Sequence, residues 1–262
     1  VEGDIKTLES DILTKDLENF FSLTKYLKNK DLKISTSNKF KFNINDKLKI
    51  KKFNLISNLI IPDLDLNLVN NKLDNTLVIK NFIKLTNNNI NLKLEGNPKN
   101  IKDAKFKLNG NSNILIDGKN DEIIYEILQE NGIKKIKTKI GLINNQINID
   151  LFNFITKTNL DSFIKLDFEI LKDKTFKFKE INLENGNNRF ISKNLKLNNK
   201  LDLLDLESVN FEFKNNHGLN NKIQISKIKN NFIIKGELLD GTSLLSKFLN
   251  EDKDKVNILK EK

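Results

Sequence analysis

Apolar and polar residues alternate with a period of two through most of this 262-residue chain. Stretches such as Phe40–Ile44, Leu64–Leu68, Ile90–Leu94 and Ile164–Ile170 carry an apolar residue at every second position. Successive side chains of a β-strand point to opposite sides, so this spacing predicts strands with one apolar and one solvated side. Strands of a buried parallel sheet would be apolar on both sides. The pattern therefore predicts a mainly β, antiparallel protein.

Asparagine-rich and glycine-containing breaks separate the alternating stretches, as at Asn87–Asn89, Asn109–Asn111, Asn144-Asn145 and Asn185–Asn187. These residue types favour turns because they tolerate backbone conformations that other residues avoid. About a dozen strands of ~5–6 residues, joined by such turns, form a long antiparallel meander.

Three segments show the spacing of a helical stripe instead. They are Leu8–Leu27, Asp121–Glu130 and Ser243–Asn250. Asn131-Gly132 has the composition of a C-terminal stop for the second of these helices.

A weak internal similarity suggests two units. A strand, an Asp-Gly turn and a short helix are predicted twice, around Asp117-Gly118 and around Asp240-Gly241. We therefore divide the chain into residues 1–132 and 133–262, with one continuous domain as the alternative.

The net charge of +10 comes from 45 Lys and Arg residues against 35 acidic ones. Only one of the basic residues is an arginine, Arg189. Proteins that grip phosphates usually use arginine as well, because its planar fork pairs with two oxygens. Abundant Lys, Asn and Ile are also expected from an AT-rich genome. Nucleic acid is therefore not expected as a partner.

Residues that carry catalysis or bind metals are scarce in the sequence. The chain has no Cys, and its one histidine, His217, lies in a predicted turn without a second His or Cys to share a metal. No nucleotide-binding glycine motif is present. Carboxylate pairs such as Asp63/Asp65 and Glu207/Glu212 fall on the solvated side of strands. We therefore expect no catalytic residue, no metal and no cofactor.

The chain has no Met and no apolar run long enough for a membrane-spanning helix. Val1–Asp4 lacks the apolar core of a signal peptide. We expect a processed product or a piece of a longer protein, with any anchor outside it.

The apolar sides of the predicted strands need a cover that three short helices supply only in part. Two sheets could close on each other as a sandwich, or one sheet could curl into an open trough that leaves its apolar side for a partner. Closed sandwiches are commoner, so the residues alone favour the sandwich.

The segment from Phe106 to Asn250 resembles the C-terminal part of AsmA-like proteins of the YhdP type from Gram-negative bacteria. The likeness lies in the strand, Asp-Gly turn and predicted helix Asp121–Gly132, the long meander, and the closing stretch Asn231–Asn250. That closing stretch is similar to the family's pattern of a strand, a glycine and a short helix that begins after Asp-Gly.

The resemblance implies a non-enzymatic segment of a bridge-like periplasmic protein. Such proteins are anchored in the inner membrane and carry phospholipids along a hydrophobic β-groove toward the outer membrane, which supports outer-membrane biogenesis. It favours the open groove over the sandwich. Its implied partners are phospholipid acyl chains, the inner membrane through an anchor outside this chain, and outer-membrane or periplasmic proteins.

Nine apolar residues on alternating strands are the candidate lining of this groove. They are Phe40, Phe42, Ile44, Leu92, Leu94, Leu166, Phe168, Phe211 and Phe213. The alternative function is a structural or adhesive β module with a closed core and no lipid ligand.

Overall fold

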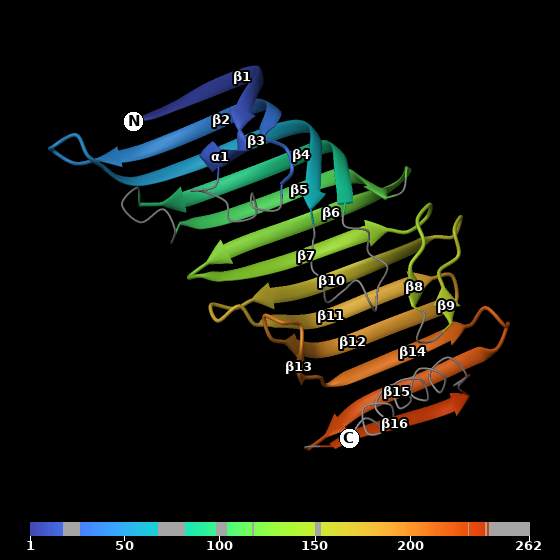
Figure 1. Ribbon diagram of the computed structural model, residues 1–262. Coiled ribbons are helices and arrows are strands. Elements are labelled where there is room, and N and C mark those ends of the chain that lie inside the picture. The colour runs from blue at the N-terminus through green and yellow to red at the C-terminus, as the bar shows by residue number, and fades with distance from the viewer. Residues whose placement is uncertain are drawn as a thin grey trace, which may run out of the picture.

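The computed structural model describes residues 1–17, 27–67, 82–97, 104–116, 118–149, 153–229, 231–238 and 240. These residues form a 14-stranded antiparallel sheet and a separate pair of two-residue strands (Figure 1). The strands of the main sheet are β1 (Glu2–Leu13), β2 (Asp31–Ile44), β3 (Ile50–Asn67), β4 (Phe82–Gly96), β5 (Lys105–Ile116), β6 (Lys119–Glu130), β7 (Ile133–Gly141), β10 (Ser162–Ile170), β11 (Phe176–Asn185), β12 (Asn188–Leu197), β13 (Leu203–Asp205), β14 (Ser208–Lys214), β15 (Asn220–Ile228) and β16 (Asn231–Leu238).

Neighbouring strands of the main sheet follow the order of the chain. The path runs from β1 through β7, continues with β10, β11, β12 and β14, and ends at β15 and β16, with β13 paired to β12. Within the described residues β1 pairs only with β2 and β16 only with β15, so the sheet does not close. The predicted open antiparallel meander is confirmed, and the alternative closed sandwich is wrong for this part of the chain.

Bulges allow the long strands to bend. In β4 one extra residue lies between the pairs Thr86↔Asn113 and Asn89↔Asn111, where Asn87 adopts a φ of 54°. The buried Asn88 amide donates to the carbonyls of Ile61 (2.8 Å) and Leu85 (3.2 Å). These bonds satisfy backbone acceptors where the ladder is interrupted, and a bulge increases the local bend of a strand.

The second predicted helix, Asp121–Glu130, is wrong. These residues belong to β6, which pairs with β5 and β7 along its length. Ile116 pairs with Lys119 and Glu130 with Ile133, so two-residue connections precede and follow β6. Asn131 (φ 53°) and Gly132 (φ 76°) both lie in the left-handed region, as a type I′ hairpin turn requires.

The first predicted helix is also mostly wrong where it is described. Its residues 8–13 belong to β1, and the only helix among the described residues is the four-residue α1 (Thr14–Leu17). Ile12 pairs with Leu32 and Leu13 with Asp31, so pairing to β2 overrides the helical spacing. Residues 18–26 and the third predicted helix, Ser243–Asn250, lie outside the described residues. The division at 132/133 falls in the β6–β7 hairpin and stays a prediction.

We expect the substitution Gly132→Ala to lower the free energy of unfolding by about 1 kcal/mol, because alanine meets a steric penalty at positive φ that glycine avoids. Gly141→Ala is the matched control, since Gly141 has no positive φ and an added Cβ would lie at 3.5 Å from the nearest atom, the Glu122 carbonyl oxygen. Urea unfolding of both variants measures the difference. Equal losses would contradict the type I′ turn.

Candidate functional site: the apolar face of the sheet

Residues paired directly across antiparallel strands share one face of a sheet, so the register defines two faces. One row of paired residues on the apolar face crosses seven strands from β4 to β12. Its members are Leu92, Leu108, Ile127, Ile136, Phe168, Phe178 and Leu195. At ~4.8 Å between strands this row is about 30 Å long. The alternation seen in single strands therefore produces a continuous apolar band across the sheet.

Two clusters of buried side chains lie at opposite parts of this band. The N-terminal cluster consists of Leu32, Ile34, Ile61 and Ile90, against which Leu27 and Leu64 pack. The C-terminal cluster consists of Leu142, Phe154, Leu183, Phe211, Phe213 and Ile223. Leu27, which packs against the N-terminal cluster, lies outside the named strands, and Leu142 and Phe154 of the C-terminal cluster lie outside the main sheet. The protein's own chain therefore covers the apolar face at these places.

The central apolar patch is the part of the band that belongs to neither cluster. It consists of Ile127, Ile136, Leu166, Phe168, Phe178, Ile181 and Leu195, all half-buried. The rings of Phe168 and Phe178 stack with 4.9 Å between their centroids. Half-buried apolar side chains on a sheet face are the type of surface that binds an apolar partner.

The C-terminal cluster is covered by residues 142–149 and 153–160, which lie between β7 and β10 in the chain and outside the main sheet. These residues contain the short pair β8 (Asn148–Ile149) and β9 (Phe154–Ile155), which lies in front of the sheet in Figure 1. Phe154 of β9 is 1% exposed. Its ring packs edge to face against the rings of Phe211 and Phe213, with centroid distances of 5.4 and 5.5 Å. We call residues 142–149 and 153–160 the covering segment.

Buried polar side chains hold the covering segment in place. The Asp121 carboxylate accepts hydrogen bonds from the backbone N–H groups of Ile143 (3.0 Å), Asn144 (3.1 Å) and Asn145 (2.9 Å), and from the Asn145 side chain (2.9 Å). Farther along, the fully buried Asn185 accepts from the Lys157 N–H (2.8 Å) and donates to the Lys157 carbonyl (2.8 Å). The segment is thus fixed to the sheet by polar bonds at both ends and by Phe154 between them.

All nine predicted lining residues lie on the apolar face, by register or by alternation along their strand. Their surroundings differ. Phe211 and Phe213 are 2% and 4% exposed beneath Phe154, and Leu92 is also buried. Leu166 and Phe168 belong to the central apolar patch. At the far end of β2, Ile44 is 40% exposed, while Phe40 and Phe42 are half-buried with ring centroids 5.1 Å apart.

Tyr125 marks the border between the N-terminal cluster and the central apolar patch. Its ring lies over Gly110 of the paired strand, where an added Cβ would come within 2.5 Å of the ring. Ser112 donates to the Asn88 side chain (2.7 Å) and is also hydrogen-bonded to Tyr125. Burial raises the pKa of the Tyr125 hydroxyl, and the bond with Ser112 opposes part of this shift. Glycine at position 110 is needed for this close approach.

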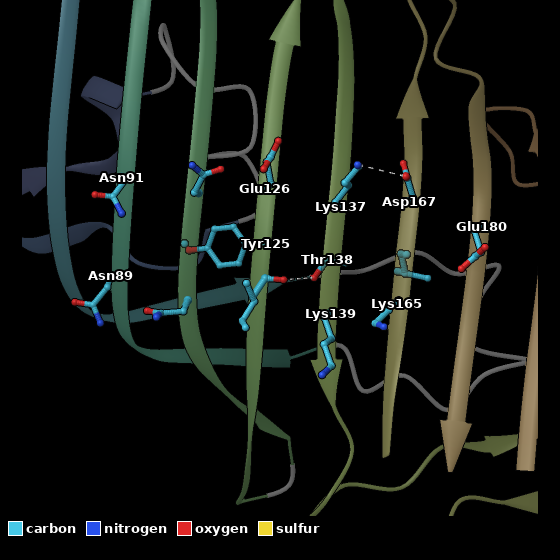
Figure 2. A pocket seen from close by; sticks show the side chains of 15 residues that line it. Asn89, Asn91, Tyr125, Glu126, Lys137, Thr138, Lys139, Lys165, Asp167 and Glu180 are labelled. Atoms are coloured by element: carbon cyan, nitrogen blue, oxygen red, sulfur yellow. Dashed lines mark hydrogen bonds and ion pairs between the residues drawn. The ribbon is translucent and has the colours of Figure 1, made fainter. Parts of the chain in front are cut away.

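A hollow of about 700 Å³ lies on the opposite, polar face, between β4 and β11 (Figure 2). Asn89, Asn91, Asn109 and Asn111 line one end of it, and Lys137, Lys139, Lys165, Asp167 and Glu180 line the other. Leu166 is the only predicted lining residue among those that border it. This hollow was not predicted from the sequence, although asparagines at alternate positions on two neighbouring strands are a visible signal.

Side chains that could bind a metal or take part in catalysis do not gather into a site elsewhere among the described residues. Within the described residues no group of three or more His, Cys, Asp or Glu side chains could hold a metal ion. His217 lies in the Asn215–Leu219 turn, where its backbone N–H donates to the Asn215 side chain (3.0 Å). Among the described residues there is no helix with the length and hydropathy of a membrane span.

The chain matches no family model, no curated protein and no solved structure. The resemblance to AsmA-like proteins therefore stays a prediction.

Proposed function

We propose that this chain is a non-enzymatic segment of a lipid-carrying protein whose apolar face holds phospholipid acyl chains. The observation that supports this proposal is the apolar row from Leu92 to Leu195, which crosses seven strands and includes half-buried side chains. The half-buried part of this row in the central apolar patch, from Ile127 on β6 to Leu195 on β12, crosses five strands or about 19 Å, which exceeds the ~15 Å that one leaflet contributes to the hydrocarbon core of a bilayer. An acyl chain can therefore lie along it.

The chemistry of the row suits movement as well as binding. Each buried methylene of an acyl chain contributes about 0.8 kcal/mol. Because Ile127, Ile136 and Phe168 offer similar apolar contacts at successive strands, a chain shifted by one strand keeps most of its contacts. Headgroups would remain in water beside the lysines and asparagines at the rim. A ligand held this way slides along the sheet instead of being locked in one pocket.

The cellular setting is part of the proposal and rests on the AsmA-like resemblance. In it, the segment works in the periplasm of a Gram-negative cell and is tethered to the inner membrane by a part of the protein outside this chain. Lipid moves toward the outer membrane, with outer-membrane or periplasmic proteins as partners.

Photo-crosslinking at two phenylalanines of β10 tests the lipid proposal. Phe168 lies in the central apolar patch, whereas Phe163 lies on the polar face, where Lys139 and Lys165 flank its ring. A photoreactive phenylalanine analogue at each position is irradiated with vesicles of phosphatidylethanolamine and phosphatidylglycerol. We expect lipid adducts at position 168 and only background at position 163, detected by mass spectrometry.

A third position gives an internal check. Phe211 lies on the apolar face but beneath Phe154, so we expect few adducts there. Lipid captured equally at positions 163 and 168 would mean non-specific contact. No capture at position 168 would overturn the proposal and favour the structural or adhesive module.

A further inference from the structure

The hollow on the polar face carries an inference that is independent of the lipid proposal, because the two sites lie on opposite faces of the sheet. Its volume of about 700 Å³ falls within the ~300–1,000 Å³ of typical small-molecule sites. Its two ends differ in chemistry, and each end points to a different part of one ligand.

Four asparagines form the first end, which we call the asparagine cluster. Asn91 pairs directly with Asn109, and Asn89 with Asn111, so all four face the hollow from β4 and β5. Asn89 donates to the Asn87 carbonyl at 3.3 Å, whereas the amides of Asn91, Asn109 and Asn111 have no partner among the described residues. The side-chain oxygen of Asn109 is buried and accepts no hydrogen bond. Carboxamides with free donors and acceptors match the hydroxyl groups of a sugar.

Two lysines form the second end. Lys139 and Lys165 stand directly opposite each other on β7 and β10, and Figure 2 shows them side by side at the edge of the hollow. Like charges in this position repel. Both ammonium groups contact the Phe163 ring, at 4.8 and 4.5 Å from its centroid, and neither has a carboxylate partner among the described residues. An anionic group between them would remove the repulsion.

The remaining residues narrow the class of ligand. Lys137 pairs with Asp167 at 3.8 Å and Lys107 with Glu126 at 3.6 Å, while Glu180 adds a further carboxylate. Three carboxylates along one rim repel a long polyanion such as a nucleic acid. On this face the apolar side chain that lines the hollow is the half-exposed Ile124, and the nearby Phe163 ring is already in contact with Lys139 and Lys165, so neither offers a free stacking surface for a base. A small ligand with a single anionic group suits the rim.

We propose that the hollow binds a soluble sugar phosphate, with the phosphate between Lys139 and Lys165 and the sugar hydroxyls on the asparagine cluster. Charge-assisted hydrogen bonds hold the phosphate. The asparagines select for a ligand that carries hydroxyl groups.

Calorimetric titration of the full chain with glucose 6-phosphate, inorganic phosphate and glucose tests the site. We expect glucose 6-phosphate to bind more tightly than either of the other two. The double variant Lys139→Gln/Lys165→Gln weakens its binding about tenfold or more, the loss expected when charged hydrogen-bond donors are removed. The double variant Asn91→Leu/Asn111→Leu, which nearly keeps side-chain size, weakens glucose 6-phosphate but leaves inorganic phosphate unchanged.

Lys177→Gln/Lys196→Gln is the matched control. These two lysines also stand directly opposite each other, but each has an acidic residue, Glu169 or Asp205, opposite it on its other side, and they do not line the hollow. The control keeps wild-type affinity if the site is local. Equal losses in both lysine variants would assign binding to general positive charge and overturn the site. A titration that shows no saturable binding of glucose 6-phosphate would also overturn the site. The same holds if the chain binds vesicles that contain phosphatidylinositol but does not bind soluble glucose 6-phosphate.

Discussion

Replacing Phe154 by alanine is expected to lower the free energy of unfolding by about 3–5 kcal/mol, the usual cost of removing a buried phenylalanine ring. Phe154 is 1% exposed and touches both Phe211 and Phe213. Strands of two residues, as in β8 and β9, cannot hold themselves together. The covering segment therefore depends on this ring for its apolar contact with the sheet.

Urea unfolding measures the loss, and hydrogen exchange of the Ile147 and Thr156 amides reports whether the covering segment opens first. The Ile147 N–H donates to the Thr156 hydroxyl (2.8 Å), and the Thr156 N–H donates to the Ile147 carbonyl (3.0 Å). Phe232→Ala is the control, since Phe232 of β16 is 46% exposed and should cost far less. Similar losses for the two variants would show that Phe154 does not anchor the segment.

Asp121→Ala is expected to cost about 3 kcal/mol, because it leaves several buried N–H groups without an acceptor. The carboxylate is 6% exposed and accepts three backbone hydrogen bonds and one from the Asn145 side chain. Removing it frees the start of the covering segment from β6. The change should appear both in urea unfolding and as faster exchange of the Ile143–Asn145 amides.

Two comparisons separate this role from a general effect of charge. Asp121→Asn keeps one acceptor oxygen, so an intermediate loss is expected. Asp167→Ala removes a carboxylate whose partner, Lys137, lies at 3.8 Å on the exposed face, and such pairs contribute at most about 1 kcal/mol. A loss for Asp121→Ala no larger than that for Asp167→Ala would contradict the anchoring role.

The apolar face could be predicted because its signal is local. Each strand shows its own alternation, and in an antiparallel meander the hairpins bring the apolar sides of successive strands onto one face. Alternation predicts Leu92, Leu166 and Phe168 on the apolar sides of their strands, and the register places all three on the same face. What alternation could not give was the burial of Phe211 and Phe213, which depends on Phe154, more than 50 residues away in the chain.

The helix predicted at Asp121–Glu130 failed because its sequence fits two periods. Ile123, Ile124, Ile127 and Leu128 make a helical stripe, yet Ile123, Tyr125 and Ile127 also alternate and all three face the apolar side. Asn131-Gly132 was interpreted as a helix stop, although the same dipeptide is the strongest short signal for a type I′ hairpin. Residues 121–130 form a strand because they pair with β5 on one side and β7 on the other.

Neither the hollow nor the anchoring of the covering segment could be read from local pattern. Asp121 looks like any charged residue at the start of a predicted element, and its partners at 143–145 follow no motif. Three members of the asparagine cluster, Asn89, Asn109 and Asn111, lie in stretches whose composition predicts turns. Asn89 and Asn111 instead meet across β4 and β5, which becomes visible only once the register is known.

The sequential order of the strands has a consequence for how such a chain folds and changes in length. Because nearly every strand pairs with its immediate predecessor, most long-range contacts form between residues of one hairpin, and the sheet can grow from any hairpin outward, as in repeat proteins. Inserting or deleting one hairpin leaves the pairing of all others intact. A sheet of this kind can be lengthened in steps of two strands, about 10 Å each, without redesign of its interior.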